Sequence, residues 1–169
     1  PIANSYYISE TQAPYGYIRN SSDVYSFNFN YLSETTPKAT FAHTFENDRT
    51  TAKIHIFKMD KETCVAIPQG DASLEGAVYG LYARNDIVHP DGATGVVFKA
   101  GDLIATLTTD KYGEAEVDNL YLGNYYVKEI TPSEGYLLDE EEHDLVCDYE
   151  GDMVAEVSRS TTSMEQVIK

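Results

Sequence analysis

Four polar residues of this chain occupy positions that share a strand face with apolar side chains. They are Lys58 (with Ile54 and Ile56), Glu129 (with Tyr125 and Val127), Glu10 (with Tyr6 and Ile8) and Asn47 (with Phe41 and Phe45). Side chains alternate across a β-strand, so each polar group is expected to point toward an apolar layer. Burying an amine or a carboxyl group is unfavourable unless the group is paired or neutralised. The pattern therefore predicts that these groups are paired or neutralised inside a core, for Lys58 and Glu129 as a buried ion pair or a coupled hydrogen bond.

A simpler interpretation stands beside this one. Strand ends often carry a Lys or Glu whose aliphatic stem is buried while its charged head reaches water. The agreement in phase of all four residues, two of them within a repeated motif, favours burial.

The segments that must position these residues are strands. Alternation with a period of two dominates the sequence. It predicts strands in "AKIHIFKMD", "GAVYGLYAR", "LIATLTT", "EAEVDN", "NYYVKEI", "DVYSFNFNY", "KATFAHTFEN", "HDLVCDYE" and "DMVAEVSRS". The stretch "TTDKYGEA" predicts a hairpin with Gly113 in the left-handed conformation. Short strands separated by turn signals indicate an all-β sandwich or a small barrel.

One motif occurs twice. "YYISETQAPYGYI" at 6–18 returns as "YYVKEITPSEGYL" at 125–137, with Glu10, Gly16 and Tyr17 each 119 positions before their counterparts. "RTTAKIHIFK" and "STTSMEQVIK" also resemble each other. This self-similarity predicts a tandem repeat. Residues 1–51 would be the C-terminal half of one repeat, residues 52–162 a complete repeat, and residues 163–169 the start of the next repeat or a linker. The chain starts Pro-Ile-Ala without Met, as expected of a piece of a longer protein.

Composition limits the partners. The 169 residues carry a net charge of −16, which disfavours nucleic acid and anionic lipid. No apolar run reaches the roughly 18 residues of a membrane helix, so no membrane insertion is expected. The two cysteines, Cys64 and Cys147, could pair in an oxidising compartment or remain two small core residues in a reducing one.

The order of motifs resembles one family. "YYISETQAPYGY" is similar to the E-box of the collagen-adhesin B-type repeats and pilin domains of Gram-positive surface proteins. "KIHIFKMDKET" resembles the first strand of those domains, "LEGAVYGLYA" a following strand, and "LTTDKYGEAEVDNLYLGNYYVKE" their turn and E-box region. The resemblance implies an immunoglobulin-like (prealbumin-like) β-sandwich.

The same resemblance implies self-crosslinking. In that family a Lys on the first strand joins an Asn or Asp on the last strand, and the E-box Glu promotes the reaction. Burial favours the neutral, nucleophilic amine and the protonated carboxyl group, and the fold supplies the proximity. Lys58 matches the nucleophile, Glu129 and Glu10 match the promoting Glu, and Asn47 matches the acceptor of the first copy, whose lysine would lie upstream of Pro1.

The acceptor for Lys58 is uncertain from sequence. Asn47 lies 11 residues before Lys58, and the residue 11 positions before Lys169 is Ser158. Asp148 and Asp152 are possible substitutes. The surface location that the family implies is oxidising, so a Cys64–Cys147 disulfide is a candidate. Residues 163–169 could also complete the half-repeat of a neighbouring molecule and bring Lys169 to Glu10 and Asn47.

We therefore expect an extracellular, cell-wall-attached structural stalk module of a Gram-positive adhesin or pilin, in contact with neighbouring repeats. The alternative is an adhesin domain that recognises a host protein or glycan, which an exposed Tyr-rich patch, for example in the 84–102 loop, would favour. No enzyme activity, cofactor or metal is expected. The acidic run "DEEEHDLVCDYEGD" with His143 has no metal-ligand spacing, so we interpret it as a solvated turn with at most loose Ca²⁺ binding. Lys38 is interpreted as an exposed loop residue.

Overall fold

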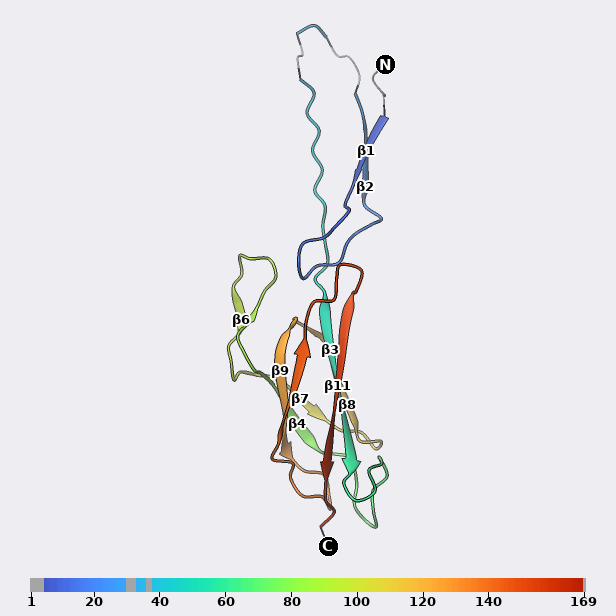
Figure 1. Cartoon of the computed structure of the whole chain (residues 1–169), viewed down its shortest axis with the longest axis vertical. Coiled ribbons are helices and arrows are strands. Elements are labelled where there is room, and N and C mark those ends of the chain that lie inside the picture. Colours follow the sequence, from blue (N-terminus) through green and yellow to red (C-terminus); the bar gives the residue numbers. More distant parts are fainter. Residues whose placement is uncertain (1–4, 30–32, 36–37, 169) are drawn as a thin grey trace.

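The computed structural model describes residues 5–29, 33–35 and 38–168, and the regular structure within these ranges is all β-strand (Figure 1). The strands are β1 (Ser5–Ser9), β2 (Val24–Asn28), β3 (Thr51–Asp60), β4 (Val78–Ala83), β5 (Ile87–Val88), β6 (Val96–Phe98), β7 (Leu103–Thr108), β8 (Glu114–Leu120), β9 (Gly123–Thr131), β10 (Glu142–Cys147) and β11 (Glu156–Glu165).

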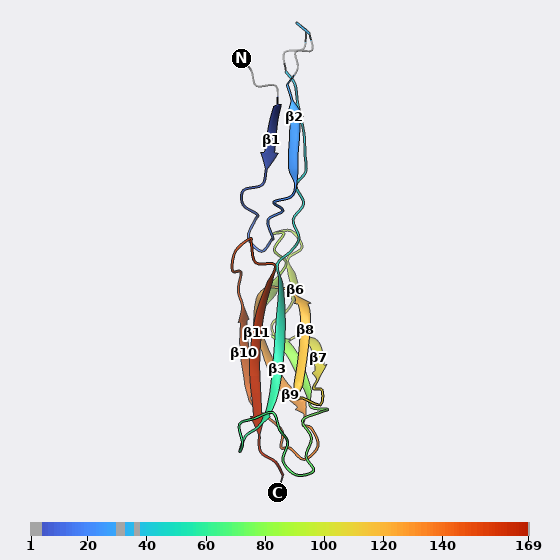
Figure 2. The same ribbon diagram turned by 90° about the vertical axis from the view of Figure 1, so that its right-hand side faces the viewer.

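Two sheets form a sandwich. One sheet has the order β10-β9-β4-β7 and the other the order β11-β3-β8. Side chains from both sheets make one apolar core, which includes Ile54, Ile56, Tyr79, Leu81 and Val127. In Figure 2 the sheet of β11, β3 and β8 lies along the length of the body. The predicted all-β sandwich is confirmed.

Alternation explains how β3 faces this core. Every second residue of β3 is buried, in the series Ala52, Ile54, Ile56, Lys58 and Asp60. The predicted phase is thus confirmed: Lys58 continues the buried face that the isoleucines begin. β3 lies between β11, its parallel neighbour, and β8, its antiparallel neighbour.

The β1–β2 hairpin lies beyond one end of this sandwich (Figure 1). β1 and β2 form an antiparallel pair, and the segment 38–48 runs beside them in extended form (Figure 1). The strand predicted in "KATFAHTFEN" is not formed, because the described part of that segment has no ladder partner for its backbone. The hairpin lies at one end of the long axis and the C-terminal end of β11 at the other (Figure 1).

The predicted "TTDKYGEA" hairpin is only half right. The turn is present, and Gly113 has a φ of +78° as expected. β7 and β8 on either side of it, however, belong to different sheets. The turn therefore carries the chain from one layer of the sandwich to the other instead of closing a hairpin.

The boundary predicted after residue 162 does not interrupt a strand. β11 continues to Glu165, and Ser163, Met164 and Glu165 pair with Lys58, Met59 and Asp60. The resemblance between "RTTAKIHIFK" and "STTSMEQVIK" thus joins two segments that lie side by side within one sandwich. Residues 163–165 already pair with β3, so they are not available to complete the half-repeat of a neighbouring molecule, as the sequence suggested. Lys169 lies outside the described residues. Among the residues described there is no helix long and apolar enough to cross a membrane.

The glycine of the β7–β8 turn supports the strand that carries Lys58. Its carbonyl accepts the Lys58 N–H at 2.7 Å, and a Cβ on Gly113 would lie 2.6 Å from the Lys58 carbonyl oxygen. We expect Gly113→Ala to lower the free energy of unfolding by about 2–4 kcal/mol, because positive φ and the backbone contact both oppose a side chain.

Gly101 is the matched control for this prediction. It has a φ of +87° but no atom within 4 Å of its would-be Cβ. Gly101→Ala should therefore show only the conformational effect, about 1 kcal/mol, in urea unfolding. Equal effects of the two substitutions would contradict the role given to the Gly113 contact.

Candidate functional site

A buried charge cluster lies where β3, β9 and β11 meet. Lys58 is 0% exposed, Glu129 2% and Glu165 3%. The Lys58 Nζ donates to Glu129 Oε1 at 2.9 Å and also to Glu165 Oε2. The predicted burial of Lys58 and Glu129 is confirmed, and their pairing connects β3 to β9 of the facing sheet.

Further hydrogen bonds hold the two carboxyl groups in place. The Asp139 backbone N–H donates to Glu129 Oε2 at 2.7 Å. Ser163 Oγ lies 2.5 Å from Glu165 Oε1 and accepts the Tyr79 hydroxyl at 2.9 Å. Burial raises the pKa of the Tyr79 hydroxyl, so Tyr79 remains a donor. Each carboxyl group of the cluster thus has a second partner besides Lys58, as a buried ion pair requires.

The cluster has one amine for two carboxyl groups. Burial raises the pKa of Glu165, against the opposing effects of its hydrogen bonds from Lys58 and Ser163 and of the Lys58 charge. A proton retained on one carboxyl group would make the cluster neutral, the state that a low-dielectric interior favours. The arrangement therefore places one amine within hydrogen-bonding distance of two carboxyl groups, one of which has a raised pKa.

Asp60 forms an anchor next to this cluster. It lies two residues after Lys58 on the same buried face, and its Oδ2 accepts the Tyr136 hydroxyl at 3.0 Å. Burial alone would raise the pKa of Asp60, but hydrogen bonds from Thr63, Gln69, Tyr136 and Glu62 outweigh it and lower the pKa to about 2. The Gly-Tyr pair that ends the repeated motif thus has a specific role, which is to hold the end of β3.

None of the three acceptors suggested for Lys58 reaches it. Ser158 is exposed and pairs with Lys53, Asp148 is exposed, and Asp152 accepts the Ala13 N–H at 3.0 Å. Glu165 occupies the place instead. The sequence analysis missed it because it counted back from Lys169. Glu165 is in phase with Val157 and Ser163 on the buried face of β11, and this alternation was the available signal.

The other half-site, Glu10 and Asn47, is assembled. Asn47 Nδ2 donates to Glu10 Oε2 at 2.6 Å and to the Ile18 carbonyl at 2.9 Å. The Asn20 N–H also donates to Glu10 Oε2, at 3.1 Å. Both side chains are half-buried. Within the ranges that the structure describes, no ion pair joins Glu10 to a Lys, Arg or His.

Matching hydrogen bonds relate the two half-sites. Ile18 N–H donates to the Asp48 carbonyl as Leu137 N–H donates to that of Gln166. Thr50 N–H donates to the Gly16 carbonyl as Ile168 N–H donates to that of Gly135. In both comparisons the residues that follow the half-site in sequence, Asp48 and Gln166 or Thr50 and Ile168, are 118 positions apart. Asn47 therefore corresponds to Glu165, and the acceptor position of the complete sandwich holds a carboxylic acid instead of an amide.

The predicted Cys64–Cys147 disulfide is wrong. Both cysteines are free; Cys64 is exposed and Cys147 is buried. The Val146 carbonyl accepts the Nε–H of Arg159, which pairs with Ile54, whereas Cys64 follows the far end of β3 at Asp60. Six residues of strand separate these levels by roughly 20 Å, well beyond the Cα separation that a disulfide spans. Burial raises the pKa of the Cys147 thiol to about 11, as expected of an inert core residue.

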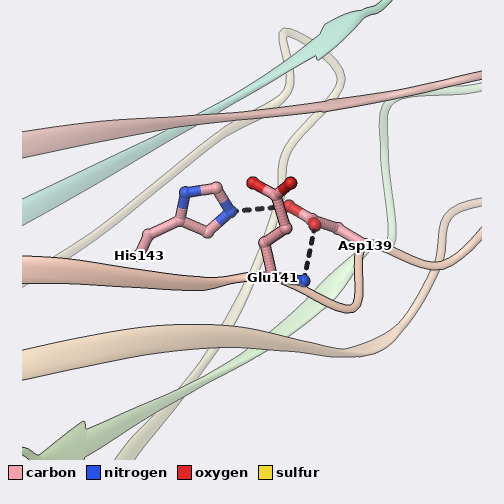
Figure 3. Close-up of side chains that lie close together, drawn as sticks. All are labelled: Asp139, Glu141 and His143. Atoms are coloured by element: carbon pink, nitrogen blue, oxygen red, sulfur yellow. Dashed lines mark hydrogen bonds and ion pairs between the residues drawn. The ribbon is translucent and has the colours of Figure 1, made fainter.

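Asp139, Glu141 and His143 form the one group of three potential metal ligands found among the described residues, with ligand atoms within 4.8 Å of one another. Figure 3 shows that the His143 ring and the Glu141 N–H both point at Asp139. The His143 Nε2 lies 2.6 Å from Asp139 Oδ2, and Ser163 Oγ lies 2.9 Å from the same oxygen. Both Asp139 oxygens already accept hydrogen bonds, so we interpret the group as a turn that positions the Asp139 N–H at Glu129.

Residues 52–161 match the family described as "SpaA: Prealbumin-like fold domain". The chain belongs to this family. The resemblance to B-type and pilin-like domains is confirmed at this level. A search of curated proteins gave no match.

The first of three similar solved structures shows the same fold. The Bacillus anthracis TIE protein is 20% identical with a TM-score of 0.62, over 95% of this chain and 25% of that one. The group B streptococcus pilus 2b backbone protein is 18% identical with a TM-score of 0.48, over 91% of this chain and 53% of that one. The minor pilin GBS52 of Streptococcus agalactiae is 21% identical with a TM-score of 0.45, over 71% and 46%. The chain thus spans about a quarter to a half of these proteins.

Removing the amine should leave two buried carboxyl groups without a counter-ion. We expect Lys58→Met to lower the free energy of unfolding by about 3–5 kcal/mol at neutral pH. The loss should shrink as the pH falls, because protonation then neutralises the carboxyl groups. The control is Lys53→Met on the same strand, where a surface pair with Glu116 at 3.0 Å is removed and the loss should stay below about 1 kcal/mol. Similar losses for both variants in urea unfolding would contradict the assigned role of Lys58.

Asp60 should make stability depend on acid pH. Its folded pKa of about 2 lies below the ordinary value of 3.8, so its contribution is present above that value and is lost as the pH falls toward 2. We expect the stability difference between the wild type and Asp60→Asn to narrow over this range. Tyr136→Phe, which removes one of the hydrogen bonds, should show a smaller difference with the same pH trend. The free energy of unfolding is measured by urea unfolding at each pH. A difference between the wild type and Asp60→Asn that stays constant from pH 5 to pH 2 would contradict this assignment.

Proposed function

We propose that this chain is a structural stalk module of a bacterial cell-surface adhesin or pilin. The observation that carries the proposal is the parallel pairing of β3 with β11 from Thr51–Glu156 to Asp60–Glu165. A stretching force would enter at the start of β3 and leave at the end of β11, and would shear the two strands along their shared axis. All ladder hydrogen bonds and the buried Lys58–Glu165 contact would then bear the load together.

Three further observations support this proposal. The chain belongs to a prealbumin-like domain family, and its motifs resemble those of Gram-positive adhesin repeats and pilin domains. The hairpin end and the C-terminal end of the molecule lie at opposite ends of its long axis (Figure 1). The net charge of −16 suits a solvated, extracellular surface. Attachment to a Gram-positive cell wall and a tandem arrangement of repeats are part of the same proposal.

The proposal extends to the crosslinking chemistry. Lys58 would be the nucleophile and Glu129 the promoting group of a Lys–Asn/Asp amide site, and in this sandwich Glu165 holds the acceptor position. The Lys58 Nζ donates hydrogen bonds to both carboxyl groups, so it presents N–H bonds to Glu165 and no lone pair that could attack a carbonyl carbon. We therefore propose that the wild-type site is held by the ion cluster alone, and that Glu10 with Asn47 belongs to a site whose lysine comes from another segment.

A single substitution tests this chemistry. In Glu165→Asn, a proton can pass from Lys58 to Glu129, the Nζ can attack the side-chain carbonyl carbon, and the C–N bond of the Asn amide can break to release ammonia. We expect the denatured, reduced variant to weigh one ammonia less than its calculated mass. The wild type should show its full mass, and Glu165→Asn with Glu129→Gln should too. A wild type lighter by one water would reveal a Lys58–Glu165 amide, and a full-mass Glu165→Asn variant would contradict the assigned acceptor position.

Single-molecule stretching through residues 51 and 168 tests the mechanical role. The wild type should unfold in one high-force step that releases the whole sandwich, at about 3.5 Å per residue. Lys58→Met should unfold at a clearly lower force, whereas Lys53→Met should not. Extension at low force without a distinct step would contradict the stalk function, whatever the mass of the Glu165→Asn variant.

The alternative of a ligand-binding adhesin domain is less well supported. The 84–102 segment, where a Tyr-rich patch would have favoured it, contains no Tyr. Lys38 is exposed, as predicted. Exposed aromatic side chains lie instead on the hairpin of β1 and β2. Their surroundings favour another segment of this kind of protein as the partner over a host protein or glycan.

A further inference from the structure

The β1–β2 hairpin and the segment 38–48 present a continuous aromatic face. We define this aromatic face by six side chains whose rings contact one another: Tyr6, Tyr25, Phe27, Phe29, Phe41 and His43. Tyr6 is 37% exposed and Phe41 41%. Rings packed against each other on one side of a two-stranded sheet leave a large apolar surface in water, which usually marks an interaction site.

The sandwich itself shows what covers the corresponding surface. Tyr125 and Val127 of β9 stand where Tyr6 and Ile8 stand in β1, 119 positions earlier. They are 1% and 0% exposed, whereas Tyr6 and Ile8 are 37% and 49% exposed. The difference comes from β3 and β4, whose side chains share the core with Tyr125 and Val127. An equivalent layer would bury the aromatic face in the same way.

The backbone beside the aromatic face also lacks a neighbour. Residues 41–47 correspond to 159–165 of β11 by the offset of 118. There, β11 pairs in parallel with β3. In the described part of 38–48 no strand ladder forms. The exposed edge therefore offers hydrogen bonds to a strand that runs parallel to it.

The Glu10 carboxyl group at this edge indicates that the partner carries a positively charged side chain. The Glu10 carboxyl accepts hydrogen bonds from Asn47 and Asn20, and no cation pairs with it in the part of the chain that the structure describes. In the sandwich the matching Glu129 is paired with Lys58. A strand that covers the aromatic face in the register of β3 would place its own lysine at Glu10 and Asn47.

We propose that the aromatic face is the docking site for the front half of another repeat of this type. This front half corresponds to residues 51–122, and its first strand alternates aliphatic side chains and carries one lysine, as β3 does. That strand lies parallel to residues 41–47, its aliphatic side chains cover Tyr6 and Phe27, and its lysine pairs with Glu10. The inference rests on the correspondence of the two half-sites and does not depend on the mechanical role of the chain.

The test extends the full chain at its N-terminus with a second copy of residues 51–122. We expect amide hydrogen exchange in 5–9 and 24–28 to slow at least 100-fold relative to the parent chain, and residues 41–47 to gain protection as a strand. The matched control carries Ile54→Asp and Ile56→Asp in the added copy only, and should leave the exchange of the hairpin unchanged. A third version with Lys58→Met in the added copy should protect the hairpin less than the unaltered extension does.

Two outcomes would overturn the inference. One is that the unaltered extension leaves exchange in 5–9 and 24–28 as fast as in the parent. The other is that the parent chain alone forms a dimer with a protected hairpin in light scattering and exchange at increasing concentration, which would make a second aromatic face the occupant. Neither result would change the stretching behaviour of residues 51–168, so failure here is distinguishable from failure of the stalk function.

Discussion

The burial of one lysine between two glutamates is the constraint on which the rest of the sandwich depends. An amine without solvent needs anionic or acceptor groups at fixed positions, and those of Lys58 come from β9 and β11. The second contacts of the carboxyl groups draw in the Asp139 backbone, Ser163 and Tyr79. Misplacing any of these three strands would leave a charge unpaired in the core, so the cluster specifies one register of β3 against β11.

The same cluster links stability to mechanics. β3 and β11 are the strands through which the chain enters and leaves the sandwich, and the charge cluster lies near the C-terminal end of their shared ladder. The Asp60–Tyr136 hydrogen bond fixes the next residues of β3 to the loop that follows β9. A load along the chain therefore meets backbone hydrogen bonds, a buried ion pair and a side-chain anchor over a short length of strand.

The acceptor position separates the two half-sites chemically. With Asn47 beside Glu10, the first half-site holds an amide whose carbonyl carbon a neutral amine could attack. With Glu165 beside Glu129, the second holds a carboxyl group to which the Lys58 amine donates a hydrogen bond. One methylene and one exchange of amide for acid thus distinguish the two half-sites, while two backbone hydrogen bonds beside them match.

Local pattern in the sequence determined much of this protein. Alternation placed Lys58 with Ile54 and Ile56, and Glu129 with Tyr125 and Val127, because the faces of a strand follow from a period of two residues. The repeated motif indicated that Glu10 and Glu129 are equivalent. Tertiary structure decided what lies across from each face. The parallel pairing of β11 with β3 brings Glu165 to Lys58. The assembly of the two sheets places β7 and β8 in different layers, and the tertiary fold keeps Cys64 far from Cys147 and leaves residues 41–47 without a ladder. These outcomes depend on contacts between residues distant in sequence, and strand periodicity carries no information about which strand becomes the neighbour.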